Sequence, residues 1–179
     1  SCCNAGAYHT GIALFERLLS LQWSGYPFHQ ILIHYARLLI NSTRPAEEAV
    51  AVMETAEDLL EEIQADHALT MEQRENTVRE HRALYAYTLA VSGEVDAAME
   101  QFTAFLMTGP VGLQEYTLDV IDALVDQLLF RQRSDDAIAF VAQHREFLMD
   151  CVENEALSQR RRERAQSCLF LQELANEKS

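Results

Sequence analysis

The chain has 179 residues, of which 49% are hydrophobic and 23% charged, so it can bury one sizeable core and is not composed like a disordered segment. Its 28 acidic and 14 basic side chains give a formal charge of -14. This balance argues against nucleic acid or an anionic membrane surface as a partner, because basic side chains must neutralise either one.

Apolar residues recur at intervals of three and four along almost the whole chain, which is the spacing of amphipathic helices. Gly25 and Gly93 interrupt this pattern, Pro45 suits the first turn of a helix, and Thr70 with Gln73 forms a capping-box signature. The predicted helices cover residues 8–23, 27–40, 45–63, 70–91, 95–107, 113–130, 134–150 and 155–175.

This order of elements predicts an all-α chain of about eight antiparallel helices joined by short turns. We expect a single domain over residues 1–179, with residues 155–175 as a C-terminal capping helix. The third helix should expose an acidic face that includes Glu57 and contains no basic residue, a pattern typical of a solvated surface.

The segment from Arg82 to Pro110 has the pattern of two paired helices. Large residues stand three or four apart in the first helix, a glycine makes the turn, and the second helix begins with a small residue, has an aromatic one four later, and ends at a proline. These residues are Tyr85, Ala86, Leu89, Gly93, Ala98, Phe102 and Pro110. Small side chains let two helices approach closely while the large ones fill the space between them. The pattern resembles the tetratricopeptide repeat, although Arg82 stands where the consensus has tryptophan.

Weaker copies of the pattern flank this segment. One spans residues 121–141 and has Gln132 where glycine is usual, another spans residues 33–56, and residues 6–18 look like the second half of a unit. The small residues at the start of the second helices are 38, 49 and 39 residues apart, rather than 34, so the repeats are degenerate. These small residues are Gly11, Ala49, Ala98 and Ala137.

The resemblance implies a right-handed α-α superhelix, a solenoid in which the first helix of each pair lines a concave groove. Groove-facing candidates for binding a partner are then His34, Tyr35, Leu38, Glu80, Tyr87, Asp119, Asp122 and Asp126. The three aspartates are spaced three and four residues apart and form one acidic stripe. Two interpretations of the stripe stay open: a surface for a segment with apolar anchors and Lys or Arg, or an ordinary solvated face.

Motifs that carry chemistry are missing from the sequence. The six histidines occur in no HExxH or ExxH pattern, and the chain contains no phosphate-binding glycine loop and no GxSxG nucleophile motif. We therefore predict no catalytic residue, no metal ligand and no cofactor. Cys151 and Cys168 lie on apolar stripes and are interpreted as buried, inert thiols. The adjacent Cys2 and Cys3 would suit a lipid anchor, but free thiols in a reducing compartment fit the cysteine pattern better.

A group of arginines lies on the last predicted helix. One interpretation is a docking site for an acidic partner or a phosphate. The favoured one is that the arginines cover the end of the stack and pair with the chain's own acidic helices. They are Arg160, Arg161, Arg162 and Arg164.

These features predict a non-catalytic adaptor or scaffold, a protein–protein interaction module that binds a peptide or helix of another protein. The alternative is a structural subunit of a multiprotein complex or a self-associating domain, and the homo-oligomeric state is left open. An enzyme with a site assembled from distant residues is a more remote alternative. Some members of the family clamp a terminal carboxylate with Lys, Asn and Arg. The matching positions here are Ala83, Tyr87, Asp122 and Asp126, so that function is not expected.

We expect a cytoplasmic protein without membrane insertion. Its most apolar stretch, residues 31–40, is far shorter than the roughly 20 residues of a membrane span and contains His34 and Arg37.

Overall fold

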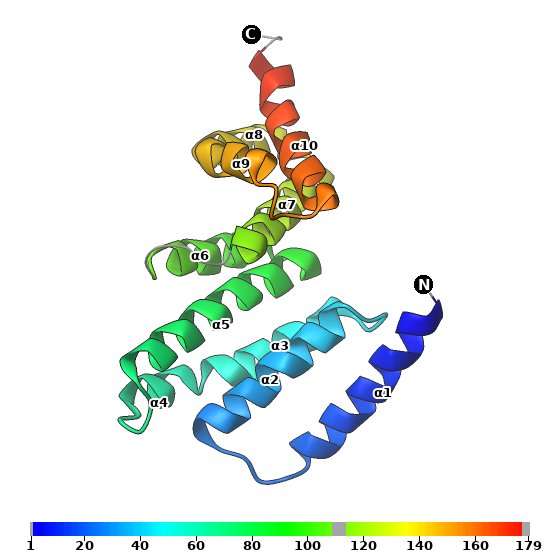
Figure 1. The fold of residues 1–179 in the computed structure, drawn as a ribbon. Coiled ribbons are helices and arrows are strands. Elements are labelled where there is room, and N and C mark those ends of the chain that lie inside the picture. Colours follow the sequence, from blue (N-terminus) through cyan, green and yellow to red (C-terminus); the bar gives the residue numbers. More distant parts are fainter. Residues whose placement is uncertain (1, 109–113, 177–179) are drawn as a thin grey trace.

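The computed structural model describes residues 2–108 and 114–176, and all the regular elements in these ranges are helices, so the predicted all-α class is confirmed (Figure 1). The predicted stop at Gly109 and Pro110 lies outside the described residues, as do the side chains of Cys2 and Cys3. The helices are α1 (Cys2–Leu19), α2 (Gly25–Ile40), α3 (Ala46–Glu57), α4 (Leu60–Ala65), α5 (Met71–Ser92), α6 (Val95–Leu106), α7 (Gln114–Phe130), α8 (Ser134–Gln143), α9 (Arg145–Glu153) and α10 (Gln159–Asn176).

Local signals in the sequence set several of these boundaries. The Thr70 hydroxyl accepts a hydrogen bond from the Gln73 backbone N–H at 3.1 Å, and the Gln73 side chain accepts one from the Thr70 N–H at 2.8 Å. The predicted capping box at the start of α5 is therefore confirmed. At the other end of α5, Gly93 takes the left-handed conformation with φ of 90°.

Two predicted helices are each divided in the structure. The third breaks between Glu57 and Leu60, where the Leu59 N–H bonds to the carbonyl three residues back at 3.2 Å and the turn tightens. Because the chain bends there, Leu60 and Ile63 stay in the core. The seventh breaks at His144, whose ring packs edge-on against Phe140 with centroids 4.7 Å apart.

The last helix begins later than predicted. Asn154, the expected N-cap just before residue 155, does not cap this helix; its side chain instead accepts a hydrogen bond from the Ala156 N–H in the preceding turn. Leu157 is buried in that turn, and Ser158 accepts the first backbone bonds of α10. Residues 154–158 are therefore not helical, and Leu157 packs into the core from this turn. The capping helix spans Gln159–Asn176 rather than residues 155–175.

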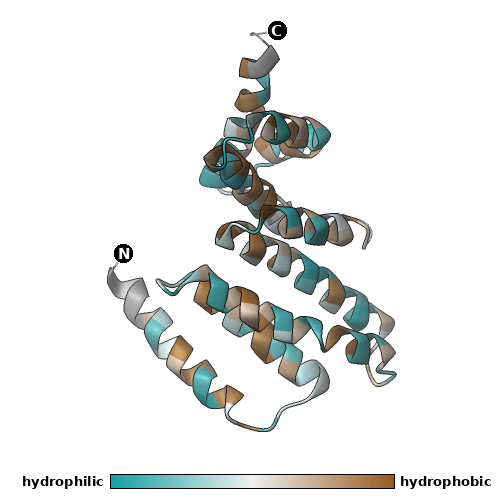
Figure 2. Cartoon of the chain, turned by 180° about the vertical axis from the view of Figure 1, so that it is seen from behind, coloured by the Kyte–Doolittle hydropathy of each residue, from teal (hydrophilic) through white to brown (hydrophobic). Residues whose placement is uncertain are grey.

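The helices pack in a series that runs from α1 and α2 at one end to α9 and α10 at the other (Figure 1). α4 packs on α2 and α5, and α8 and α9 each pack on α7 and α10. α5 lies centrally and contacts α3, α6 and α7, and α10 closes on α7, α8 and α9. Figure 2 shows hydrophobic and hydrophilic residues alternating along each helix, as expected when only part of each helix surface is buried.

One large hydrophobic cluster extends from α5 to α10 and includes Val50 of α3. One of two smaller clusters joins α1, α2 and α3, and the other joins α2, α3 and α5. Of the small residues named in the repeat pattern, Gly11 is partly buried, and four are completely buried. These four are Ala49, Ala86, Ala98 and Ala137.

The turns after α5 and α7 close in the same way. Glu94 N–H bonds to Leu89 O at 2.8 Å, and Arg133 N–H bonds to Leu128 O at 2.8 Å. Gln132 takes the left-handed conformation with φ of 60°, as Gly93 does after α5. The N–H groups of Gly93 and Gln132 also bond three residues back, to Ala90 O at 3.1 Å and to Leu129 O at 3.0 Å. The same two backbone bonds therefore end both helices.

Candidate partner-binding surface

Side chains from α2, α5 and α7 meet on one surface of the chain. The Arg37 guanidinium of α2 donates to Glu80 of α5 at 2.6 Å and stands 5.2 Å from the centre of the Tyr116 ring on α7. The geometry is that of an ion pair combined with a cation–π contact. Arg37 thus links three helices that are far apart in the sequence.

The acidic stripe of α7 faces α10. Arg161 Nη2 lies 3.1 Å from Asp119, and Arg164 Nη1 lies 3.2 Å from the same carboxylate. Arg164 also donates to Asp122 through Nε at 2.6 Å and through Nη2. The Asp122 side chain is 14% exposed, so its charge is largely removed from water and depends on this partner. The interpretation that these arginines pair with the chain's own acidic helices is confirmed for Arg161 and Arg164.

Tyr87 of α5 lies beside this ion-pair cluster. Burial raises the pKa of its phenol, and the negative charge of Asp119 raises it further. Asp126, one turn beyond Asp122, is exposed, and its carboxyl pKa is raised by partial burial and by the charge of Asp122. Two of the three aspartates therefore hold arginines of α10, while the third is open to solvent.

The candidates on α2 are divided by α1, which packs over part of that helix. Tyr35 is 7% exposed and stacks on Phe15 of α1 with ring centroids 5.8 Å apart. Leu38 packs against Gly11, where an added Cβ would lie only 2.9 Å from a Leu38 methyl group. His34 is exposed. The structure therefore places Glu80 beside Arg37 and Tyr87 beside Asp119, and places Tyr35 and Leu38 in the contact with α1.

A second polar cluster, which sequence reasoning missed, lies between α2, α3 and α5; its two histidines are buried, and Glu57 is 33% exposed. His29 Nε2 lies 3.1 Å from His81 Nδ1, and His81 Nε2 lies 2.6 Å from Glu57 Oε2. Glu57 also accepts from Arg82 Nη1 at 2.7 Å. Arg82 in turn donates to Gln101 of α6 at 2.7 Å. Glu57 is thus a partly exposed ion-pair partner of His81 and Arg82, rather than a freely solvated residue of the acidic face.

The hydrogen-bond chain assigns the histidine tautomers. Because the Glu57 carboxylate only accepts, His81 carries its proton on Nε2, and His29 must donate through Nε2 to the free Nδ1 of His81. Burial lowers the pKa of His29 to about 3, and the pKa of His81 is lowered by burial despite its bond to Glu57. Both rings are therefore neutral at pH 7.

No sequence motif identified this cluster or the α7–α10 ion pairs. Glu57 and His81 are 24 residues apart, and Asp122 and Arg164 are 42 apart, so no local spacing relates them. The available signals were weaker: two histidines on otherwise apolar faces, and an arginine group in an acidic chain.

Within the part of the chain that the structure describes, no three His, Cys, Asp or Glu side chains are grouped as a metal site would require. None of the described helices is both long and apolar enough to span a membrane. No known family profile, curated protein or solved structure matches the chain.

Proposed function

We propose that the chain is a non-catalytic adaptor or scaffold module that binds a segment of another protein. The segment would carry apolar anchors together with Lys or Arg side chains, and would lie across α2, α5 and α7. The observation that carries the proposal is the acidic stripe of α7. Two of its aspartates already hold guanidinium groups from one helix, while Asp126 remains exposed one turn further on.

The same proposal includes a right-handed superhelix of tetratricopeptide type. The identical closure of the turns at Gly93 and Gln132 supports it, because such turns set the angle between paired helices. So does the burial of Ala98 and Ala137, which lie 39 residues apart at matching places after those turns. In this arrangement α2, α5 and α7 are the first helices of their pairs and share one face.

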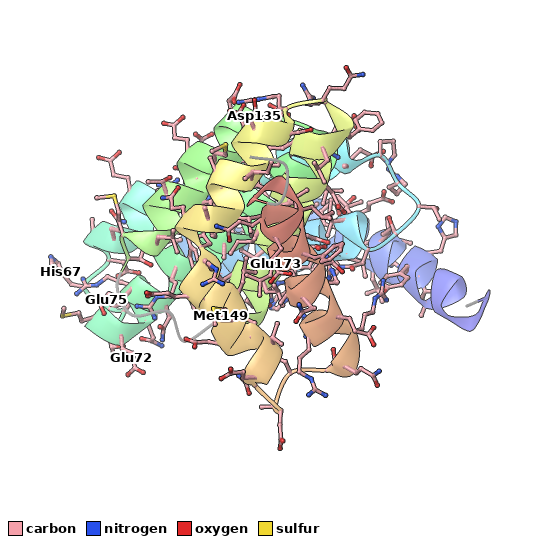
Figure 3. The ribbon with its side chains drawn as sticks, turned by 90° about the horizontal axis from the view of Figure 1, so that it is seen from above. His67, Glu72, Glu75, Asp135, Met149 and Glu173 are labelled. Atoms are coloured by element: carbon pink, nitrogen blue, oxygen red, sulfur yellow. The ribbon has the colours of Figure 1, made fainter. Side chains whose placement is uncertain are left out.

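Partner binding by Asp126, the exposed residue of the acidic stripe, can be tested directly. Asp126→Lys reverses the exposed charge, whereas Asp119 and Asp122 are poor targets because they also hold α10. The matched control is Asp135→Lys on α8, an exposed aspartate at the outer edge of the molecule (Figure 3). Circular dichroism should show that both variants keep the helical fold.

Affinity capture followed by mass spectrometry should recover a protein that the original chain and the Asp135→Lys variant retain and the Asp126→Lys variant loses. A photo-crosslinking residue in place of the exposed His34 should attach to the same protein. Equal capture by both variants would overturn the proposal for this surface. The cytoplasm is the expected compartment, in which the free thiols of Cys151 and Cys168 would persist.

A further inference from the structure

α10 covers part of the acidic stripe of α7, which consists of Asp119, Asp122 and Asp126. Asp119 lies 3.1 Å from Arg161 Nη2 and 3.2 Å from Arg164 Nη1. Arg164 Nε also donates to Asp122 at 2.6 Å. The two arginine side chains are 29% and 32% exposed, so water and dissolved ions reach both. In the proposed function, the basic side chains of a partner would need these same two carboxylates.

The contacts advance along α7 and α10 in the same direction. Asp119 contacts both arginines, and Asp122, one turn further on, contacts Arg164. The next residue of α10 in this register is Cys168, four residues after Arg164. Burial raises the pKa of its thiol, and so do the charges of Asp122 and Asp126, so both carboxylates lie near it. Asp126 is thus beside a position where α10 has a thiol instead of a base, and it stays exposed.

Small side chains attach α10 to the core. The largest buried apolar groups in the described part of this helix are Cys168 and Leu169, which are 4% and 8% exposed. Phe170 and Leu174 are 54% and 39% exposed. Residues 154–158, between α9 and α10, are not helical, and a stretch of this kind lets the following helix move as a unit. Release of α10 therefore exposes little large apolar surface of its own, and the ion pairs with α7 supply part of its attachment.

We propose that α10 is an internal competitor for the acidic stripe, and that the partner is a helical segment with basic side chains at positions i, i+3 and i+7 that displaces it. The inference rests on the proposed function, because it concerns the same aspartates. Positions i and i+3 correspond to Arg161 and Arg164, and position i+7 corresponds to Cys168. A helix with a third base there pairs with all three aspartates, whereas α10 pairs with two. The formal charge of -14 also attracts a basic competitor.

Two synthetic peptides of residues 159–176 test the register. The first carries Cys168→Arg, which places a base at position i+7. The control carries Ser167→Arg and Cys168→Ser, so it has the same composition, but its added base lies outside the register. Fluorescence anisotropy with the complete chain should show that the first peptide binds about tenfold more tightly than the control. Added salt should weaken this binding, because it screens the attraction between the charges.

Displacement of α10 can be followed at Cys168 of the chain, because neither peptide contains cysteine. Iodoacetamide should label this thiol about tenfold faster when the first peptide is saturating, since α10 then leaves the core. In Arg161→Gln/Arg164→Gln, α10 competes less strongly, so the first peptide should bind about tenfold more tightly than it binds the original chain. In Asp126→Lys the two peptides should bind equally, whereas the Asp135→Lys control should keep the preference.

Three results would overturn the inference: equal affinity of the two peptides for the original chain, no binding of either peptide, or binding that leaves Cys168 protected. If circular dichroism shows that the double arginine variant unfolds, the two peptides on the original chain still decide. The partner surface fails separately. Capture of a protein through Asp126 while Cys168 stays protected would remove only the displacement of α10, whereas equal capture by Asp126→Lys and Asp135→Lys would remove the surface itself.

Discussion

Gln132 repeats, 39 residues further along the chain, the left-handed backbone conformation of Gly93. Both residues end a helix, and both are followed by an N–H that bonds back to the last turn at 2.8 Å. The two turns also touch, because the Arg131 guanidinium donates to the Gly93 carbonyl. Glycine adopts this conformation freely, whereas the Cβ of glutamine makes it costly.

Gln132→Gly should therefore stabilise the chain by about 0.5–1 kcal/mol, despite the greater freedom of glycine in the unfolded state. Urea unfolding followed by circular dichroism measures the change as a higher midpoint. The reverse change, Gly93→Gln, should destabilise by more than about 1 kcal/mol, since it places a side chain at φ of 90° with a new Cβ 3.0 Å from Arg131 Nη2. A loss of stability in Gln132→Gly would contradict the shared turn geometry.

Stability should fall as the pH drops below about 6.5, because His29 and His81 are buried as neutral rings. Above that pH, the folded and unfolded states are both neutral at these sites. Below it, the unfolded chain takes up protons, while folded His29, with a pKa of about 3, does not. The free energy of unfolding should then decrease by about 1.4 kcal/mol per pH unit for His29, with a further contribution from His81.

Urea midpoints at several pH values between 7.5 and 5 would measure this slope. His29→Asn keeps a donor for His81 Nδ1 but cannot titrate, so its slope should be shallower than that of the original chain. The control is His67→Asn, at an exposed position at the edge of the molecule (Figure 3), which should leave the slope unchanged. Equal slopes in all three proteins would mean that His29 is not buried as described.

Arg164→Met should destabilise the chain by about 1–3 kcal/mol. The change keeps the apolar stem but leaves Asp122, whose side chain is only 14% exposed, without its guanidinium. Arg160→Met, at an exposed position on the same helix, should change stability by less than about 0.5 kcal/mol. If both variants lose the same stability by thermal unfolding, the ion pair with Asp122 contributes nothing specific.

The thiols of Cys151 and Cys168 should resist alkylation in the folded chain. The two residues are 1% and 4% exposed, and burial raises their pKa values to about 11 and about 12. At pH 8 both the scarce thiolate and the poor access should slow labelling by more than about a hundredfold relative to the urea-unfolded chain. Peptide mass spectrometry after iodoacetamide treatment gives the two rates. Fast labelling of Cys168 alone would show that α10 detaches from the rest of the fold.

The features of the fold that could be predicted from the sequence are those set by residues close together in the chain. The helices and the start of α5 at Thr70 were predictable, because their signals act over three or four residues. The breaks at Leu59 and His144 were not. No glycine or proline marks them, and the His144 ring packs against Phe102 of α6, a residue distant in the sequence.

The candidate surface likewise combines features set by neighbouring residues with features set by contacts between distant helices. By itself the sequence determined an all-helical chain, the periodic acidic stripe of α7 and an arginine group near the C-terminus, since each is a pattern of neighbouring residues. Only the tertiary structure decided that Asp122 holds Arg164, that Glu57 is drawn inward by His81 and Arg82, and that α1 covers Tyr35. The physical reason is that the energy of a charge depends on its burial and its nearest partner, and both are set by helices far apart in the chain.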